Sequence, residues 1–143
     1  MASTTPQTTA TATAVDRLLA QMRAQRARWV ELVPATEGGV PAKRVQILRP
    51  PEADLPDFLT TTPDGKHTLS AEQRHVEKYT IGWDGITEAD LIGPAGSSEA
   101  APFAPALWAA LTVDRMAWSR VVAQALLDAI VEHRNAVEGD AKN

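Results

Sequence analysis

The chain has 143 residues, of which 44% are hydrophobic and 22% charged, and its formal net charge is −4. These values fit one small globular domain rather than a disordered chain. The acidic balance argues against nucleic acid as a partner, because that role needs clustered positive charge. Since the chain has no cysteine, it has no disulfide framework, no thiolate nucleophile and no Cys-based zinc site.

The two ends of the chain differ in composition from its middle. Residues 1–13 consist mostly of Thr and Ala, which offer too little apolar surface to offset an ordering entropy of about 1–2 kcal/mol per residue. We therefore predict a disordered tail at 1–13, a single small domain over 14–137 and a flexible C-terminus at 138–143.

Neither a membrane nor a metal is expected as a partner. The sequence has no run of about 18 apolar residues and no basic, apolar leader, so we predict no membrane span and no signal peptide. The three histidines lack a metal-binding spacing such as HExxH; they are His67, His75 and His133. We accordingly expect no metal and no cofactor.

Residues 14–32 predict the first helix, because apolar side chains return every three or four positions among strong helix formers. These apolar positions are Val15, Leu18, Leu19, Met22, Trp29 and Val30. Arg26 falls within the apolar arc. Either its charged head extends out of a groove, or the helix docks on an acidic partner.

A strand is predicted at residues 43–49, where Val45 and Ile47 alternate onto one face before two prolines end the run. We expect it at the edge of a sheet or within a small one. A short helical turn is predicted at 54–59. Residues 60–68 are predicted to form a loop centred on a Pro-Asp-Gly turn.

A helix of about ten residues is predicted after Ser70, with Gln73 at the spacing of a capping box and Gly82 as its end. Another short helical turn is predicted at 87–91. A loop follows at 93–101, which has the composition of an irregular segment.

Two helices are predicted in the last third of the chain. Pro105 suits the first position of one helix. The long C-terminal helix is predicted to start at Thr112 or Asp114, whose side chains can accept a hydrogen bond from a free amide. Its core-facing stripe comprises Trp118, Val121, Val122, Ala125, Leu126, Ala129 and Ile130. The predicted class is α+β, mainly helical, with a small β element near 43–49.

A second apolar pair on the last helix, Leu127 and Val131, lies away from the main stripe and near Arg120. The pair is either simply exposed, as single apolar residues often are, or it serves partner docking or self-association. Together with Arg26, these residues are the candidate partner-binding residues.

The run Gly82-Trp83-Asp84-Gly85 predicts a turn in which the glycines supply positive φ and the indole anchors the turn to the core. Trp108 and Trp118 are predicted as further structural anchors. The run lacks the spacing of a glycine-rich phosphate loop. Nucleotide binding is therefore unsupported.

No catalytic residue is predicted. Asp84, Glu88 and Asp90 are close in sequence, but a turn aspartate bonds local amides and acidic residues favour a helix start. The serines at 97–98 have no evident His/Asp partners, and His75 alone does not define a general base. We expect a non-enzymatic protein, with a small enzyme of unknown reaction as the alternative.

One part of the chain resembles small tail-assembly proteins of long-tailed bacteriophages. In those proteins a V-x-G-W-x-G-V-T-x-x-D turn precedes a loop, a Phe- and Pro-containing segment and a terminal helix. The segment RVQILRP at 44–50 is also similar to their β element. The residues that carry the resemblance are YTIGWDGITEADL at 79–91, Phe103, Pro105, Leu107-Trp108 and Asp114-Arg115.

The resemblance implies a tail assembly chaperone. Such a protein is non-enzymatic, coats the tape measure protein while tail tube subunits polymerise, and is absent from the finished particle. The implied partners are the tape measure or tube protein, and the implied location is the host cytoplasm. A tail or baseplate component that stays in the virion is the alternative.

Overall fold

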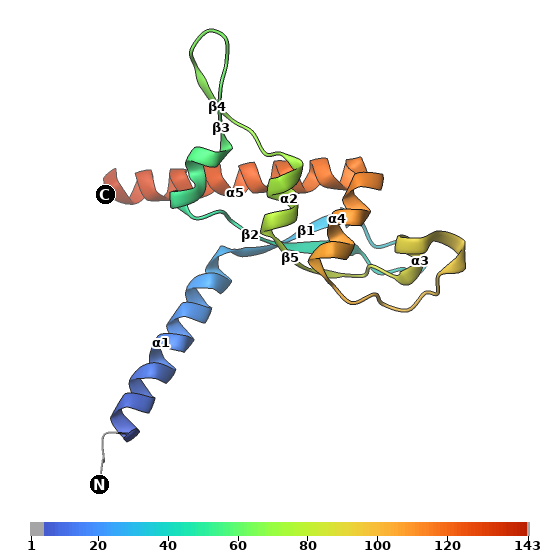
Figure 1. The fold of residues 1–143 in the computed structure, drawn as a ribbon, viewed down its shortest axis with the longest axis horizontal. Helices are drawn as coiled ribbons and strands as arrows, with labels where there is room; N and C mark the ends of the chain where they lie inside the picture. Colours follow the sequence, from blue (N-terminus) through green and yellow to red (C-terminus); the bar gives the residue numbers. More distant parts are fainter. Residues whose placement is uncertain (1–4, 143) are drawn as a thin grey trace.

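The computed structural model describes residues 5–142, and it describes side chains from residue 12 to residue 141. It confirms the predicted class, α+β and mainly helical. In chain order (Figure 1) the elements are α1 (Thr5–Arg26), β1 (Ala27–Val33), β2 (Lys43–Leu48), the 3-10 helix η1 (Glu52–Phe58), β3 (Leu59–Thr61), β4 (His67–Leu69), α2 (Gln73–Tyr79), β5 (Thr80–Asp84), α3 (Glu88–Ile92), the 3-10 turn η2 (Gly93–Ala95), α4 (Pro105–Asp114) and α5 (Met116–Lys142).

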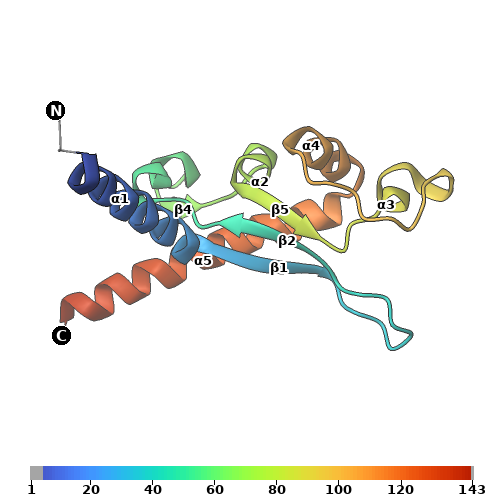
Figure 2. The same ribbon diagram turned by 90° about the horizontal axis from the view of Figure 1, so that it is seen from below.

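Three antiparallel strands form the main sheet in the order β1-β2-β5, so the predicted strand at 43–49 is the central strand β2. Val45 of β2 pairs with Val30 of β1 and with Trp83 of β5, which places these side chains on one face. Helix α5 crosses the sheet and contacts β1 and β2 (Figure 2). The sheet therefore has one covered face and one open face, on which Trp29 is 43% exposed.

The core lies where α5 meets the sheet, α2 and α4. The predicted stripe of α5 is buried except at Ala125, which is half-buried, and at Val121, which is 41% exposed because it lies at the margin of the apolar arc. The buried cluster comprises Val30, Val45, Ile47, Phe58, Val76, Tyr79, Ile86, Trp108, Leu111, Trp118, Val122, Leu126 and Ile130.

The first predicted helix is wrong in its last turns. Helix α1 ends at Arg26, and the chain continues directly as strand β1. In β1 the buried Val30 faces Val45, while Trp29 points to the open face. Pairing with β2 therefore overrides a helical spacing that Trp29 and Val30 happened to share with the residues before them.

Both ends of the chain are more helical than the sequence suggested. Helix α1 begins at Thr5, within the segment predicted to be disordered, and residues 1–4 lie outside the described residues. The tract holds more threonine than alanine, so its helix depends on continuation from the turns that follow it rather than on its own propensity. Helix α5 likewise continues to Lys142 through the predicted flexible C-terminus.

The helix predicted after residue 70 is shorter than expected and is capped by other residues. Its N-cap is Glu72, which forms a capping box with His75. Helix α2 ends at Tyr79, and Gly82 lies inside strand β5 without a positive φ. Gly82 therefore neither ends a helix nor supplies a turn, because pairing with β2 extends the chain through it.

The predicted start of the last helix is also wrong. Thr112 and Asp114 both belong to α4, and a break at Arg115 separates α4 from α5. The Thr112 hydroxyl donates to the carbonyl of Trp108 at 3.0 Å, one turn back in the same helix, so it does not cap a helix start.

Gln73, predicted to close a capping box, joins three helices instead. Its Nε2 donates to Oγ1 of Thr112 on α4 at 2.5 Å, and its Oε1 accepts from the hydroxyl of Ser119 on α5 at 2.5 Å. Because Thr112 and Ser119 are buried, this amide satisfies polar groups that would otherwise be unpaired in the core.

The loop predicted at 60–68 contains the expected turn inside a small hairpin. Strands β3 and β4 pair over three residues each, and Gly65 takes a φ of +82° at the turn. Figure 1 shows this hairpin projecting away from the sheet. The strands escaped prediction because they are short and exposed and so carry no apolar alternation.

Candidate functional site

The clustered carboxylates take part in separate structural contacts. Oδ2 of Asp84 lies 3.1 Å from Nε of Arg44, across strands β5 and β2. Glu88 accepts a hydrogen bond of 2.8 Å from the hydroxyl of Ser97. Asp84 and Glu88 thus each bond to a different part of the chain, as structural carboxylates do.

Asp90 is held at the start of α3. Its Oδ2 accepts from the backbone amide of Thr87 at 2.8 Å and lies 2.7 Å from Nζ of Lys43. Partial burial alone raises the pKa of Asp90, but the hydrogen bonds from Lys43 and Thr87 outweigh it, so the pKa lies below its usual value. Asp90 is therefore a charged helix cap tied to the sheet.

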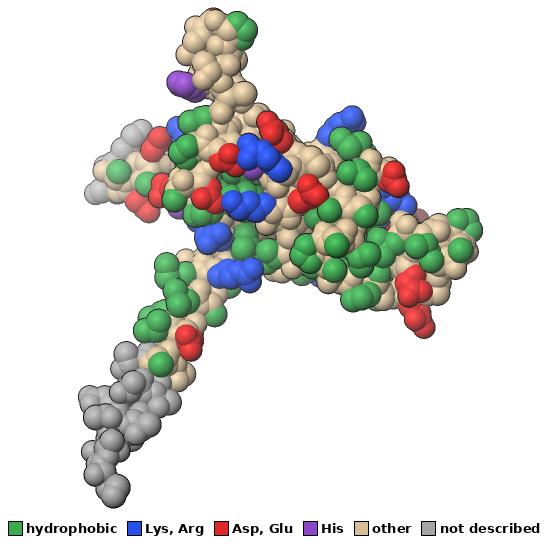
Figure 3. Space-filling model, viewed as in Figure 1, with side chains coloured by type: hydrophobic (Ala, Val, Ile, Leu, Met, Phe, Trp, Pro, Cys, Tyr) green, Lys and Arg blue, Asp and Glu red, His purple; other side chains and the backbone are tan. Residues whose placement is uncertain are grey.

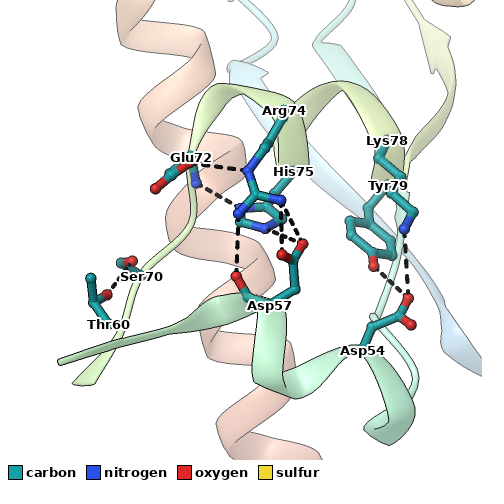
Figure 4. Close-up of polar contacts among 9 residues, drawn as sticks. All are labelled: Asp54, Asp57, Thr60, Ser70, Glu72, Arg74, His75, Lys78 and Tyr79. Carbon is teal, nitrogen blue, oxygen red and sulfur yellow. Dashed lines mark hydrogen bonds and ion pairs between the residues drawn. The ribbon is translucent and has the colours of Figure 1, made fainter. Parts of the chain in front are cut away.

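His75 belongs to a polar cluster that the sequence did not indicate (Figure 4). The imidazole is 1% exposed and stacks on Phe58 with ring centroids 4.0 Å apart. Its Nδ1 accepts from the amide of Glu72 at 2.9 Å. That contact leaves the proton on Nε2, which donates to Oδ2 of Asp57 at 3.0 Å.

The other members of this cluster complete a clamp between η1 and α2. Arg74 donates from Nη1 to both carboxylate oxygens of Asp57 at 2.9 and 2.7 Å. Hydrogen bonds from Arg74, then from His75, hold the pKa of Asp57 below its usual value. The nearby hydroxyl of Ser70 bonds Thr60 at 2.7 Å. Both imidazole nitrogens are thus engaged in structural bonds, and the cluster joins two elements.

We expect the single tyrosine to resist ionisation. Tyr79 is 4% exposed and its hydroxyl donates to Oδ2 of Asp54 at 2.6 Å. Burial first, and then the bond to Asp54, raise the pKa of Tyr79 well above its usual value of 10. Ultraviolet absorbance at about pH 11 should show almost no tyrosinate in the folded protein and a large tyrosinate signal in denaturant.

This titration also predicts a direction for stability. The folded state holds the Tyr79 phenol neutral, so its contribution is complete below the unfolded pKa of about 10 and is lost as the pH rises further. In Tyr79→Phe the free energy of unfolding should therefore depend less on pH in the alkaline range. An unchanged dependence, or a native tyrosinate signal near pH 10, would contradict the assignment.

The tryptophans and glycines predicted as structural anchors differ in burial and in backbone conformation. Trp108 is fully buried, and Trp118 is 8% exposed under the guanidinium of Arg115. Trp83 is half-buried and donates from Nε1 to the carbonyl of Ala101 at 2.7 Å. Gly85 has a φ of +80°, so the turn glycine is Gly85 alone.

The predicted partner-binding residues lie on two helices and differ in exposure. Leu127 is partly buried against the core, whereas Val131 is 43% exposed and Arg120 is exposed, all on α5. Arg26 lies at the base of α1, where its Nε donates to the carbonyl of Arg49 at 3.0 Å.

The junction of α1 and β1 is fixed by a reciprocal contact. The amide of Arg49 donates to the carbonyl of Arg26 at 2.8 Å, opposite the side-chain bond from Arg26. Burial, followed by the positive charge of Arg26, lowers the pKa of Arg49. Arg26 therefore has a structural role at the junction, and its proposed role in docking stays a prediction.

A hollow of about 500 Å³ lies between α3 and α4. This volume falls within the range of about 300–1,000 Å³ that is typical of binding pockets. Ile92 at its rim is 63% exposed. Apolar side chains and three charged residues line it together; the lining residues are Ala89, Asp90, Leu91, Ile92, Gly93, Leu107, Ala110, Leu111, Asp114 and Arg115.

A second apolar surface lies on α1, which projects from the body (Figures 1 and 3). The sequence indicated its apolar positions, but they do not enter the core. We call this surface the α1 stripe; its residues are Val15 at 48%, Leu18 at 50%, Leu19 at 58% and Met22 at 62% exposure. Exposed apolar side chains gathered in this way are typical of interaction sites.

Comparison with known proteins gave no match: no family model, no curated protein and no solved structure is significantly similar to the chain. Among the described residues, no helix combines the length and the hydropathy that crossing a bilayer demands. The same residues include no group of three or more His, Asp or Glu side chains placed to hold a metal ion.

Proposed function

We propose that the chain is a non-enzymatic tail assembly chaperone of a long-tailed phage, which binds the tape measure protein in the host cytoplasm. One observation carries the proposal. More than half of the residues that line the hollow between α3 and α4 belong to those on which the resemblance to tail-assembly proteins rests; they are Ala89, Asp90, Leu91, Leu107, Asp114 and Arg115. The segments that resemble the family thus coincide with a cavity suited to a partner.

The shape and chemistry of the hollow fit a protein partner. Its wall offers Leu107 and Leu111 to an apolar side chain, as in grooves that accept one face of an amphipathic helix. Asp114 and Arg115 in its lining supply charges that can fix the direction of a bound segment. Arg115 is itself positioned by stacking on Trp118, with its Cζ 4.5 Å from the ring centroid.

The carboxylates and the imidazole support a binding role over catalysis. Asp84, Glu88, Asp90 and His75 are each engaged in a contact that joins two structural elements or caps a helix. Replacing a structural group of this kind affects folding, whereas replacing a catalytic group affects activity alone. A folded variant of one of these residues that lost biological activity would favour the enzyme alternative.

Co-expression with the phage's tape measure protein tests the proposal. We expect a soluble complex with the wild-type chain. Ile92→Glu and Ala110→Arg should each weaken the complex at least about tenfold, because they place a charge at the rim or on the wall of the hollow. Affinity can be measured by calorimetry on the purified complex partners.

A matched control lies on the same helix. Val113 is 60% exposed on α4 but does not line the hollow, so Val113→Glu should leave the affinity unchanged. Equal loss in all three variants, or no complex with the wild-type chain, would contradict the proposal. Detection of the chain in stoichiometric amounts in purified virions would favour the alternative of a structural tail or baseplate component.

A further inference from the structure

Helix α1 projects from the body (Figure 1), and only its last turns, at Ala20, Arg23 and Ala24, border the sheet. Among described residues 12–25, every side chain is exposed except Ala14, which is half-buried. Isolated helices of this length are marginal in water, because their stability in proteins comes mostly from packing of an apolar face. The α1 stripe therefore needs a partner surface to hold α1 as a helix.

The charges on α1 indicate the sign of that surface. Arg17 and Arg23 are exposed and, among the described side chains, neither has a carboxylate partner. With Arg26 they outnumber the single acidic residue of the helix, Asp16. A surface that covers the α1 stripe should therefore be acidic.

The free end of α5 offers two carboxylates for this contact, in a stretch of sequence that also holds Arg134 and Lys142. Glu138 and Asp140 are exposed there and also lack a basic partner among the described side chains. Val137 is 44% exposed beyond the end of the body. Figures 1 and 2 show that the free ends of α1 and α5 project from the same end of the molecule and diverge. Within one chain, the basic helix and the acidic helix end therefore do not meet.

We propose that the α1 stripe docks on the free end of α5 of a second copy of this chain, forming a symmetric dimer. The contact is made twice, since each copy offers both a basic helix and an acidic helix end. A two-fold arrangement of this kind closes on itself and leaves no complementary surface to recruit further copies. This dimer does not depend on the hollow or on the proposed chaperone function.

The direction of the helices fits this arrangement. When two bodies face each other, the tip of each α1 lies near the partner's body, and the tip of each α5 lies near the base of the facing α1. The two helices then run parallel. Arg23, close to the base of α1, comes opposite the tip of α5 that holds Glu138 and Asp140.

The test is the oligomeric state of the full chain, measured by light scattering after size exclusion and by sedimentation velocity. We expect a dimer. Leu18→Glu and the double variant Arg17→Glu/Arg23→Glu should each raise the dimer dissociation constant at least about tenfold. High salt should also weaken the dimer, because the exposed charges are screened.

Charge exchange identifies the partner surface. Glu138→Arg/Asp140→Arg should weaken the dimer as the α1 double variant does, and all four substitutions in one chain should restore it. Ile92→Glu is the control, since it changes an exposed apolar residue in the hollow and should leave the dimer intact. A monomeric wild-type chain would overturn the proposal. So would a dimer that the charge variants do not weaken, or one that the combined variant does not restore.

Discussion

Trp108→Ala should lower the free energy of unfolding by about 3–5 kcal/mol, the range for truncating a large aromatic side chain in a core. Trp108 is fully buried, contacts Trp83 edge-on with ring centroids 6.5 Å apart, and donates from Nε1 to the carbonyl of Val76 at 3.2 Å. Removal leaves a cavity between α2, α4 and β5. Since small domains are stable by only about 5–15 kcal/mol, the variant should unfold at much lower urea concentration, as measured by circular dichroism.

Trp29 provides the matched control for this substitution. It is 43% exposed on the open face of the sheet, where Arg44 stacks over its ring at 4.4 Å. Trp29→Ala should therefore cost only about 1 kcal/mol, through loss of the cation–π contact and of partial burial. Similar costs for the two tryptophans would show that the core is not where the structure places it.

Gly85→Ala should also be strongly destabilising, by about 3 kcal/mol. A Cβ at this position would overlap the carbonyl oxygen of Ala42 and lie 3.1 Å from its carbonyl carbon. The backbone φ of +80° adds the cost of a left-handed conformation, roughly 1–2 kcal/mol for a residue other than glycine. The steric overlap and the conformational cost arise at the same residue, just after the end of β5. Thermal or urea unfolding should therefore measure their sum as one loss of stability.

Gly39 separates the two causes. It has a φ of +90°, but nothing lies within 4 Å of an added Cβ. Gly39→Ala should therefore show the conformational cost alone, about 1–2 kcal/mol. The difference between the two variants then measures the steric contact with Ala42. Equal values would mean that the close approach of the two backbone segments is absent in solution.

The elements that the sequence predicted well are those whose pattern is local. The long last helix and the strand at 43–49 were predicted because burial repeats along them with a regular period. The turn at Gly65 was predicted because its residues favour it without help from elsewhere. The two outer strands, β1 and β5, were missed because each is defined by pairing with β2, a contact between distant parts of the chain.

The surfaces were harder to predict than the fold. Periodicity indicated that Val15, Leu18 and Leu19 share one face of a helix, but it cannot tell whether that face meets the core or solvent. The polar cluster of Asp57, Arg74 and His75 joins positions up to 18 residues apart, with no motif to connect them. The hollow between α3 and α4 likewise depends on how two short helices approach each other.

The passage from α1 to β1 without an intervening loop also has a mechanical consequence. A loop at this point would act as a hinge between the helix and the sheet. Instead, two hydrogen bonds between Arg26 and Arg49 hold the junction. A molecule that binds α1, and so holds it as a helix, is therefore coupled to the edge of the sheet without a flexible linker between them. The direction in which a bound α1 points thus determines the orientation of the sheet relative to its partner.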